Sequence, residues 1–277
     1  MVLIMTVGDR LLDTALSSFE GKGIFVKEIE TSLLSGEVDL AVHSLKDLPA
    51  QLPPGLLLGA ITRREDARDV LVAETSWTLK TLPHRAVIGT SSPRRVAQLR
   101  LVRPDLRAEV VRGNLGTRLV KLARGECQAL VLAAAGLQRL GRTEGIREYL
   151  PLSVVLPAPG QGALGLEASE EDGELLAALG ELDHLPTARD CRAERAFLGA
   201  LGGGCQVPLG AWAREESEPD QEPVLVISGL VADPDGGEVC RGEERGSLNN
   251  PESLGERLAD RLRAVGAEAI LERVKNA

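Results

Sequence analysis

The chain has 277 residues, 43% of them hydrophobic, which is typical of a globular protein with two or three domains. A formal net charge of -9 and an aromatic content of 2% argue against a nucleic-acid partner, because surfaces that bind nucleic acids are usually rich in cations and in aromatic side chains that stack on bases. No apolar run reaches the length of a membrane span, and residues 1–7 are too few for a signal-peptide core, so we expect a cytoplasmic protein without a membrane partner.

The first part of the chain predicts strands at residues 2–7, 39–44 and 57–61, with a helix over about residues 24–34. Lys46 and Asp47 follow the second of these strands. In open α/β sheets, ligands collect beyond the carboxyl ends of strands, so this loop is a candidate site. An aspartate shortly before a proline is also a common turn former, and the local sequence leaves both roles open.

A second α/β unit is predicted from strands at residues 70–73, 86–90, 108–111 and 128–133, followed by helical turns over residues 134–150. Ser92 and Pro93 suit the N-cap and the first position of a helix whose first turn holds Arg94 and Arg95. Two cations at this position interact unfavourably with the helix dipole, and an anion bound at the helix N-terminus would offset that cost. The alternative is a merely solvated arginine pair.

A similar strand-to-helix turn follows at residues 112–118, with Arg112, Gly113 and Arg118. Between residues 85 and 124 lie nine arginines and one lysine, against only Asp105 and Glu109. A basic region inside an acidic protein favours a polyanionic ligand that is held locally.

Two segments are predicted to cross between the first and second units: residues 63–68 and the Gly- and Pro-rich residues 158–162. The second unit is then inserted into the first. We expect an α/β fold of two periplasmic-binding-protein-like domains with a double crossover, plus a small C-terminal α+β domain. The expected boundaries are 1–63 with 160–183 for domain 1, 64–159 for domain 2 and 184–277 for domain 3.

Domain 3 is predicted to begin with a helix from Thr187, which forms a capping box with Asp190. Strands at residues 209–213 and 223–232 and a return strand follow, separated by an acidic turn over residues 215–222. A final amphipathic helix begins after Asn250, with Leu254, Leu258 and Leu262 on one face.

Residues 202–204 are three glycines that precede Cys205 between the predicted helix and strand. The glycines remove side chains that would block approach to the thiol, so Cys205 is a candidate nucleophile open to a bulky partner. A helix end followed by a loop with a chance cysteine is the alternative. The four cysteines lie far apart and the three histidines are scattered, so no disulfide framework or metal site is indicated.

Seven segments together resemble the porphobilinogen deaminase (hydroxymethylbilane synthase) family, in the family's order and over nearly the whole chain. They are GKGIFVKEIE (21–30), DLAVHSLKDLP (39–49), GTSSPRR (89–95), RGNLGTRL (112–119), LAAAGLQRLG (132–141), LPAPGQGALGLE (156–167) and GGCQVPLGAWA (203–213).

The resemblance implies a cytoplasmic, monomeric transferase of tetrapyrrole (haem) biosynthesis. It joins four porphobilinogen molecules head to tail with release of ammonia, and hands hydroxymethylbilane to the next enzyme of the pathway. It further implies one covalent dipyrromethane cofactor per chain, bound by a thioether to Cys205, and Asp47 as the catalytic aspartate. The implied cofactor contacts are Ser44, Lys46, Thr90, Ser92, Arg94, Arg95, Arg112, Gly113 and Arg118, and the implied substrate contacts are Lys22, Phe25, Arg94 and Arg118.

One departure concerns the N-terminus, because Met1 falls after an Arg-x-Ser-x-Leu-Ala strand-helix segment that family members usually carry. We expect a longer natural product, and low solubility and activity for a chain that starts at Met1. The competing interpretations are a periplasmic-binding-protein-like small-anion binding protein and a plain α/β protein with an anion site. Neither accounts for Cys205 together with Asp47.

Overall fold

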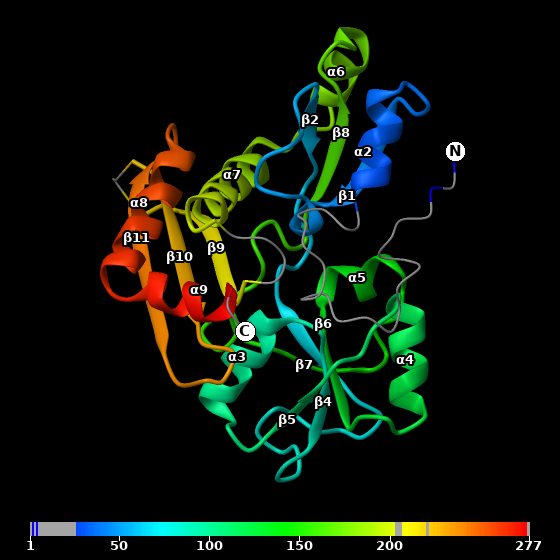
Figure 1. Ribbon diagram of the computed structural model, residues 1–277, viewed down its shortest axis with the longest axis vertical. Helices are drawn as coiled ribbons and strands as arrows, with labels where there is room; N and C mark the ends of the chain where they lie inside the picture. Colours follow the sequence, from blue (N-terminus) through cyan, green and yellow to red (C-terminus); the bar gives the residue numbers. More distant parts are fainter. Residues whose placement is uncertain (1, 3, 5–25, 203–206, 220–221, 276–277) are drawn as a thin grey trace.

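The computed structural model describes residues 2, 4, 26–202, 207–219 and 222–275. Its strands form three sheets, and the chain passes from the first sheet to the second and back before it forms the third (Figure 1). The strand expected at residues 2–7 lies almost wholly outside the described residues. None of the helices in the described part of the chain combines the length and the apolar composition needed to cross a bilayer.

The first sheet contains β1 (Leu40–Ser44), β2 (Leu56–Ile61) and β8 (Leu164–Ser169), in the order β1-β8-β2. β8 is antiparallel to both neighbours, although more than a hundred residues separate it from β2 in the chain. Helix α2 (Lys27–Leu34), the short η2 (Leu45–Asp47) and α6 (Gly173–Gly180) accompany this sheet. The shared sheet establishes the double crossover.

The second sheet contains five strands in the order β5-β4-β6-β3-β7. Their bounds are β3 (Asp69–Val72), β4 (Val87–Gly89), β5 (Arg107–Glu109), β6 (Ala129–Ala133) and β7 (Ile146–Tyr149). Alternate residues of β3 and β6 enter two separate apolar cores. One core takes Leu99 of α3 (Pro93–Val102), and the other takes Leu122 of α4 (Leu115–Ala123) and Leu137 of α5 (Ala134–Arg139). Both faces are therefore covered by helices, as strands made of continuous apolar residues require.

The helical turns expected through residue 150 are wrong beyond Arg139, because residues 146–149 form β7 at the edge of this sheet. β7 pairs antiparallel with β3, and Ile146 and Tyr149 pack on the second core. The guanidinium of Arg68 lies 4.6 Å from the centre of the Tyr149 ring. Pairing to a strand far away in the chain outweighs the local helical pattern here.

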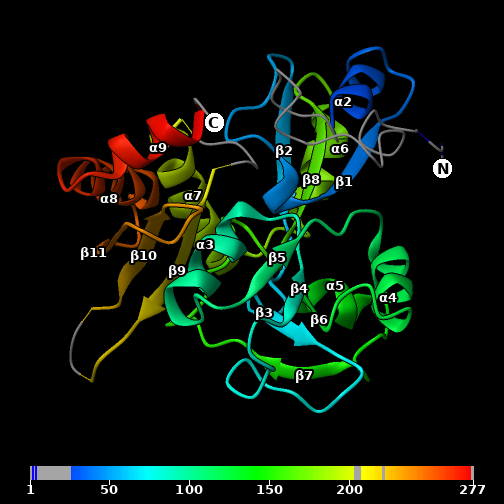
Figure 2. The same ribbon diagram turned by 60° about the horizontal axis from the view of Figure 1, so that its bottom comes forward.

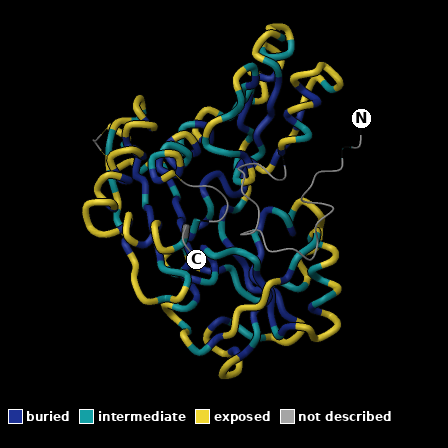
Figure 3. Tube along the Cα trace, viewed as in Figure 1, coloured by how far each residue is buried: buried dark blue, intermediate teal, exposed yellow. Residues whose placement is uncertain are grey.

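The third sheet is an antiparallel meander of β9 (Leu209–Glu216), β10 (Val224–Ala232) and β11 (Val239–Ser247). Its first strand extends into the acidic segment expected to form a turn. Helices α7 (Leu185–Ala200), α8 (Pro251–Ala264) and α9 (Ala267–Lys275) accompany it, and the predicted stripe of Leu254, Leu258 and Leu262 is buried in their common core. Figure 3 shows buried stretches of chain in the interior of the molecule and exposed ones mostly at its edges. α7 and α8 approach so closely that a Cβ on Gly255 would collide with the Ala193 carbonyl.

Leu230 of β10 packs with Ala97 of α3 and with Leu156, so the third sheet rests on the helix that carries the arginine pair (Figure 2). This mixed α/β architecture with a small C-terminal α+β unit confirms the predicted fold class.

The capping box expected at Thr187 and Asp190 is wrong, because α7 begins earlier, at Leu185. The N-cap is His184, whose Nδ1 accepts a hydrogen bond from the Thr187 N–H at 3.3 Å. Pro186 occupies the first turn, where its fixed φ suits a helix start. The Thr187 hydroxyl instead accepts the backbone N–H of Arg64 at 3.1 Å.

Candidate functional site

The first turn of α3 carries the two adjacent arginines, and its N-cap is Ser92 as predicted, with the Ser92 Oγ accepting the Arg95 N–H at 3.4 Å. Both guanidinium groups turn inward to Asp69, the first residue of β3. Arg94 Nη1 lies 2.7 Å from Asp69 Oδ2, and Arg95 Nη2 lies 2.7 Å from Oδ1. The arginine pair is therefore buried and bonded to a carboxylate, which excludes the solvated alternative.

Asp69 is fully buried. Burial alone would raise the pKa of its carboxyl, but the charges and hydrogen bonds of Arg94 and Arg95 outweigh burial and hold that pKa well below its usual range. One carboxylate neutralises only one of the two arginines. The cluster keeps an excess of positive charge in a region with little access to water, which is an environment that an anion would stabilise.

Gln161, from the return crossing, joins this cluster to Lys46. Its Nε2 donates to Asp69 Oδ1 at 3.0 Å and to the Ala67 carbonyl at 2.7 Å, and its Oε1 accepts from Lys46 Nζ at 3.3 Å. Burial lowers the pKa of Lys46 to about 8; the charges of Arg95 and Arg94 add to this effect, while Asp47 and Asp69 oppose it. Arg94 and Arg95 thus share a single buried carboxylate, and Lys46 is connected to it through the Gln161 amide.

Asp47 ends η2 and is exposed, while Leu45 and Leu48 on either side are buried. The chain after it is held from α7, because Arg195 donates to the carbonyls of Leu48, Pro49 and Ala50 at 3.5, 2.7 and 3.1 Å. The buried neighbours and the Arg195 hydrogen bonds fix the backbone that carries this solvent-facing carboxylate.

Arg118, in the first turn of α4, donates from Nε to the Gly113 carbonyl at 2.8 Å. Burial lowers its pKa, as do the neighbouring charges of Arg95 and Arg112, whereas Asp47 raises it. The charges of Arg95 and Asp47 both act on Arg118, so charged residues of α3, α4 and η2 lie within electrostatic reach of one another. Gly113 has φ +107°, and a Cβ there would lie 2.8 Å from the Thr117 side chain, so this turn requires glycine.

Hydroxyl groups accompany the cations. Thr90, at the end of β4, is buried, and its Oγ1 accepts the Ser92 N–H at 3.3 Å. Ser44, the last residue of β1, is exposed immediately before η2. These side chains offer neutral donors beside the arginine pair and beside Asp47.

Three predicted site residues, Lys22, Phe25 and Cys205, lie outside the described residues. The other cysteines are buried and unlinked. Burial raises the pKa of all three thiols, to about 12 for Cys191, so little nucleophilic thiolate forms on them at neutral pH. Within the described ranges, no group of side chains is arranged to hold a metal ion.

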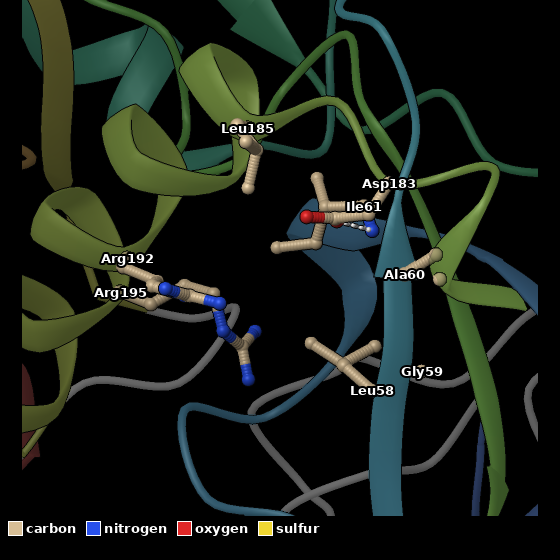
Figure 4. Close-up of a pocket in the computed structure, with 9 residues that line it drawn as sticks. Leu58, Gly59, Ala60, Ile61, Asp183, Leu185, Arg192 and Arg195 are labelled. Carbon is tan, nitrogen blue, oxygen red and sulfur yellow. Dashed lines mark hydrogen bonds between the residues drawn. The ribbon is translucent and has the colours of Figure 1, made fainter. Parts of the chain in front are cut away.

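A cavity of about 420 Å³ lies between β2 and the start of α7 (Figure 4). Leu58, Ile61 and Leu185 line it, and Asp183 Oδ1 accepts the Ile61 N–H at 2.7 Å on its wall. Arg195 also lines it. The cavity therefore borders the clamp on the chain after Asp47, and none of the cationic residues around Asp69 lines it.

A second buried cluster of charges lies where the chain crosses between sheets. Glu194 of α7 is fully buried and bonds Arg64 of the first crossing through two contacts, at 2.6 and 2.9 Å. The same carboxylate accepts the N–H groups of Gly160 at 2.7 Å and Ala213 at 2.8 Å. One side chain thereby joins both crossings to the third sheet.

Sequence reasoning missed Asp69, Gln161, Arg64 and Glu194. A charged residue at the start of the apolar segment DVLV was the one local sign of Asp69. Gln161 lies in residues 158–162, which the sequence pattern identifies only as a linker. The glycines and proline of this segment indicate a turn and give no sign that the glutamine side chain bonds other residues.

Comparisons with known proteins agree along the chain. Residues 1–177 match the family model described as "Porphobilinogen deaminase, dipyromethane cofactor binding domain", and residues 188–264 match "Porphobilinogen deaminase, C-terminal domain". The porphobilinogen deaminase of Synechococcus elongatus is 50% identical over 272 residues, which cover 97% of this chain and 83% of that protein. The porphobilinogen deaminase of Geobacillus kaustophilus is 51% identical over 273 residues, covering 98% and 86%. Among solved structures, the periplasmic VFT2 domain of Bordetella pertussis BvgS aligns with 57% of this chain and 66% of its own at a TM-score of 0.34.

Proposed function

Since this chain belongs to the porphobilinogen deaminase family, we propose that it joins four porphobilinogen molecules head to tail, releases ammonia at each step and frees hydroxymethylbilane. The observation that carries this proposal is a cluster in which Arg94 and Arg95 bond the single carboxylate of Asp69, and Gln161 connects Lys46 to that carboxylate. Each pyrrole unit brings an acetate and a propionate, so the growing chain adds two negative charges per step. A region with buried excess positive charge can hold such a chain.

A dipyrromethane group, which also carries acetate and propionate side chains, fits the same excess of positive charge. We assign its attachment to Cys205 through a thioether, since the thiols of Cys127, Cys191 and Cys240 are buried with raised pKa values. When bound, this group supplies the covalent anchor from which the chain extends. Arg94 and Arg95 would hold its carboxylates, with Lys46, Ser44, Thr90, Ser92, Arg112, Gly113 and Arg118 as further contacts.

Asp47 is the catalytic residue in this proposal. Loss of ammonia from porphobilinogen leaves a positively charged pyrrole whose N–H groups become more acidic. An exposed carboxylate on a held backbone stabilises that cation and accepts or returns its protons. Lys22, Phe25, Arg94 and Arg118 would bind the incoming substrate.

The finer organisation belongs to the same proposal. Domain 1 comprises residues 1–63 and 160–183, domain 2 residues 64–159 and domain 3 residues 184–277, which is supported by one sheet in each. The protein is a cytoplasmic monomer that passes hydroxymethylbilane to the next enzyme of tetrapyrrole synthesis. Size-exclusion chromatography with light scattering tests the monomer.

The deciding experiment incubates the purified chain with porphobilinogen and measures ammonia release together with formation of hydroxymethylbilane. We expect four substrate molecules consumed per product, and an intact mass that exceeds the sequence mass by one two-ring adduct. An unmodified chain that binds porphobilinogen without turnover would favour the small-anion binding protein instead.

A further inference from the structure

Gln161 lies in the return crossing, residues 158–162, and its side-chain amide reaches the charged cluster around Asp69. It is fully buried and bonds side chains from η2 and β3. Its backbone is fixed separately, because its N–H donates to the Ala158 carbonyl at 2.9 Å and its carbonyl accepts from Arg64 Nε at 2.8 Å. The crossing therefore determines where this amide lies.

The orientation of the amide follows from its partners. The Ala67 carbonyl and Asp69 Oδ1 only accept, so they select the NH₂ end, while the Lys46 ammonium only donates and selects Oε1. A flipped amide would lose all three hydrogen bonds. Gln161 thus has one stable arrangement, in which a neutral group connects a cation and an anion.

We propose that Gln161 is the positioning residue of this site: it holds the Lys46 ammonium in a fixed relation to the Asp69–arginine cluster, and it links that relation to the crossing between the sheets. The inference rests on the proposed function of the site. It adds that the Lys46 ammonium binds the carboxylates of the growing pyrrole chain only when the Gln161 amide holds it in this position.

The charges around this amide show why its neutrality matters. Lys46 of η2 and Asp69 of β3 bond the amide directly. Arg94 and Arg95 of α3 bond the same Asp69 carboxylate, and their charges and that of Asp47 act on Lys46. Arg64 bonds its carbonyl. Removing Oε1 takes an acceptor from the charged form of Lys46, so the pKa of Lys46 should fall further below its usual value.

The first test measures Lys46 directly. The holoenzyme is labelled with an amine-acylating reagent across a pH series, and peptide mass spectrometry follows the modification of Lys46. In Gln161→Met, which keeps volume without hydrogen bonds, we expect the pKa of Lys46 to fall by about 0.5–1 unit. Gln98 provides the matched control, because it is a buried glutamine whose side chain bonds the backbone of Arg94 and Leu156. Gln98→Met should leave the pKa of Lys46 unchanged.

The second test is kinetic. Gln161→Met should raise KM for porphobilinogen about 3- to 10-fold with a smaller change in kcat, as loss of one charge-assisted hydrogen bond in binding predicts. Gln161→Glu should retain part of its activity at low pH, where a protonated carboxyl donates to Asp69 and accepts from Lys46, although its single O–H leaves the Ala67 carbonyl without the second donor that the amide supplies. It should lose activity as pH rises and the new carboxylate faces Asp69. Gln161→Met should show no such recovery at low pH.

A Gln161→Met enzyme with the wild-type Lys46 pKa and KM would overturn the inference, as would an equal shift in Gln98→Met. These outcomes are distinct from failure of the proposed function, in which wild-type protein itself would not consume porphobilinogen. Intact mass confirms that every variant compared carries the same adduct.

Discussion

Two buried clusters of charge use the same residue types in different proportions. Around Asp69, two arginines share one carboxylate, and Lys46 lies one amide away. Around Glu194, one arginine meets one carboxylate in a two-contact pair, and two backbone N–H groups satisfy the remaining acceptor capacity. The first cluster is left with excess positive charge, whereas the second is balanced.

The difference extends to neighbouring carboxyl groups. The arginines hold the pKa of Asp69 well below its usual range against the effect of burial. Next to Glu194, burial and the Glu194 charge raise the pKa of Asp190 to about 7, and Arg189 and Arg64 only partly offset them. A cluster with excess cations is suited to bind anions, while a balanced one mainly holds the structure together.

The largest effect is expected from removing the thiol to which the cofactor is proposed to bind. Cys205→Ala should abolish cofactor attachment and turnover, whereas Cys240→Ala, which removes a buried thiol of raised pKa, should abolish neither. Intact mass and peptide mapping measure the adduct. An adduct mapped to Cys127, Cys191 or Cys240 would contradict the assignment.

The comparison itself is tested by removing each carboxylate charge. Glu194→Gln leaves Arg64 buried without its counter-charge and should lower the free energy of unfolding by about 3–5 kcal/mol. Asp69→Asn should also destabilise, but in a cofactor-free Cys205→Ala background added phosphate should restore much of the loss, because an anion can replace the missing carboxylate.

Urea unfolding with and without phosphate measures both variants. If phosphate restores Glu194→Gln as well as Asp69→Asn, or neither of them, the two clusters do not differ in their capacity for anions.

Asp47→Asn separates catalysis from binding at the edge of the first cluster. The amide keeps the size of the side chain but carries no charge, so turnover should fall by on the order of 10²–10³, or about 3–4 kcal/mol of barrier. The melting temperature should hardly change, because Asp47 is exposed. Near-normal turnover would leave Asp47 as a turn former.

The smallest effect concerns pH and the second cluster. The folded-state pKa of Asp190, about 7, lies above its unfolded value of 3.8, so its contribution to stability is present below pH 3.8 and is lost as pH rises through 7. Asp190→Asn removes this titration. Relative to that variant, the wild type should lose roughly 2 kcal/mol between these pH values, discounted for the partial exposure of the side chain. Parallel stability curves for the two proteins would contradict the raised pKa.

Much of the secondary structure and the general location of the site could be predicted. Ser92 and Pro93 begin α3 as expected, and the leucine stripe of α8 is buried as its period requires. The concentration of arginines between residues 85 and 124 indicated a local anion site. Such signals operate within a turn or two of helix, so a linear pattern contains them.

The partners of the charged groups could not be predicted, because they lie far apart in the chain. Asp69 meets Arg94 and Arg95 across 25 and 26 residues, Gln161 meets Asp69 across 92, and Glu194 meets Arg64 across 130. The sequence determined which residues carry charge and which helices present them. Only tertiary packing decided which charges are balanced, because a buried charge selects its partner by the fold that brings the two together and excludes water from both.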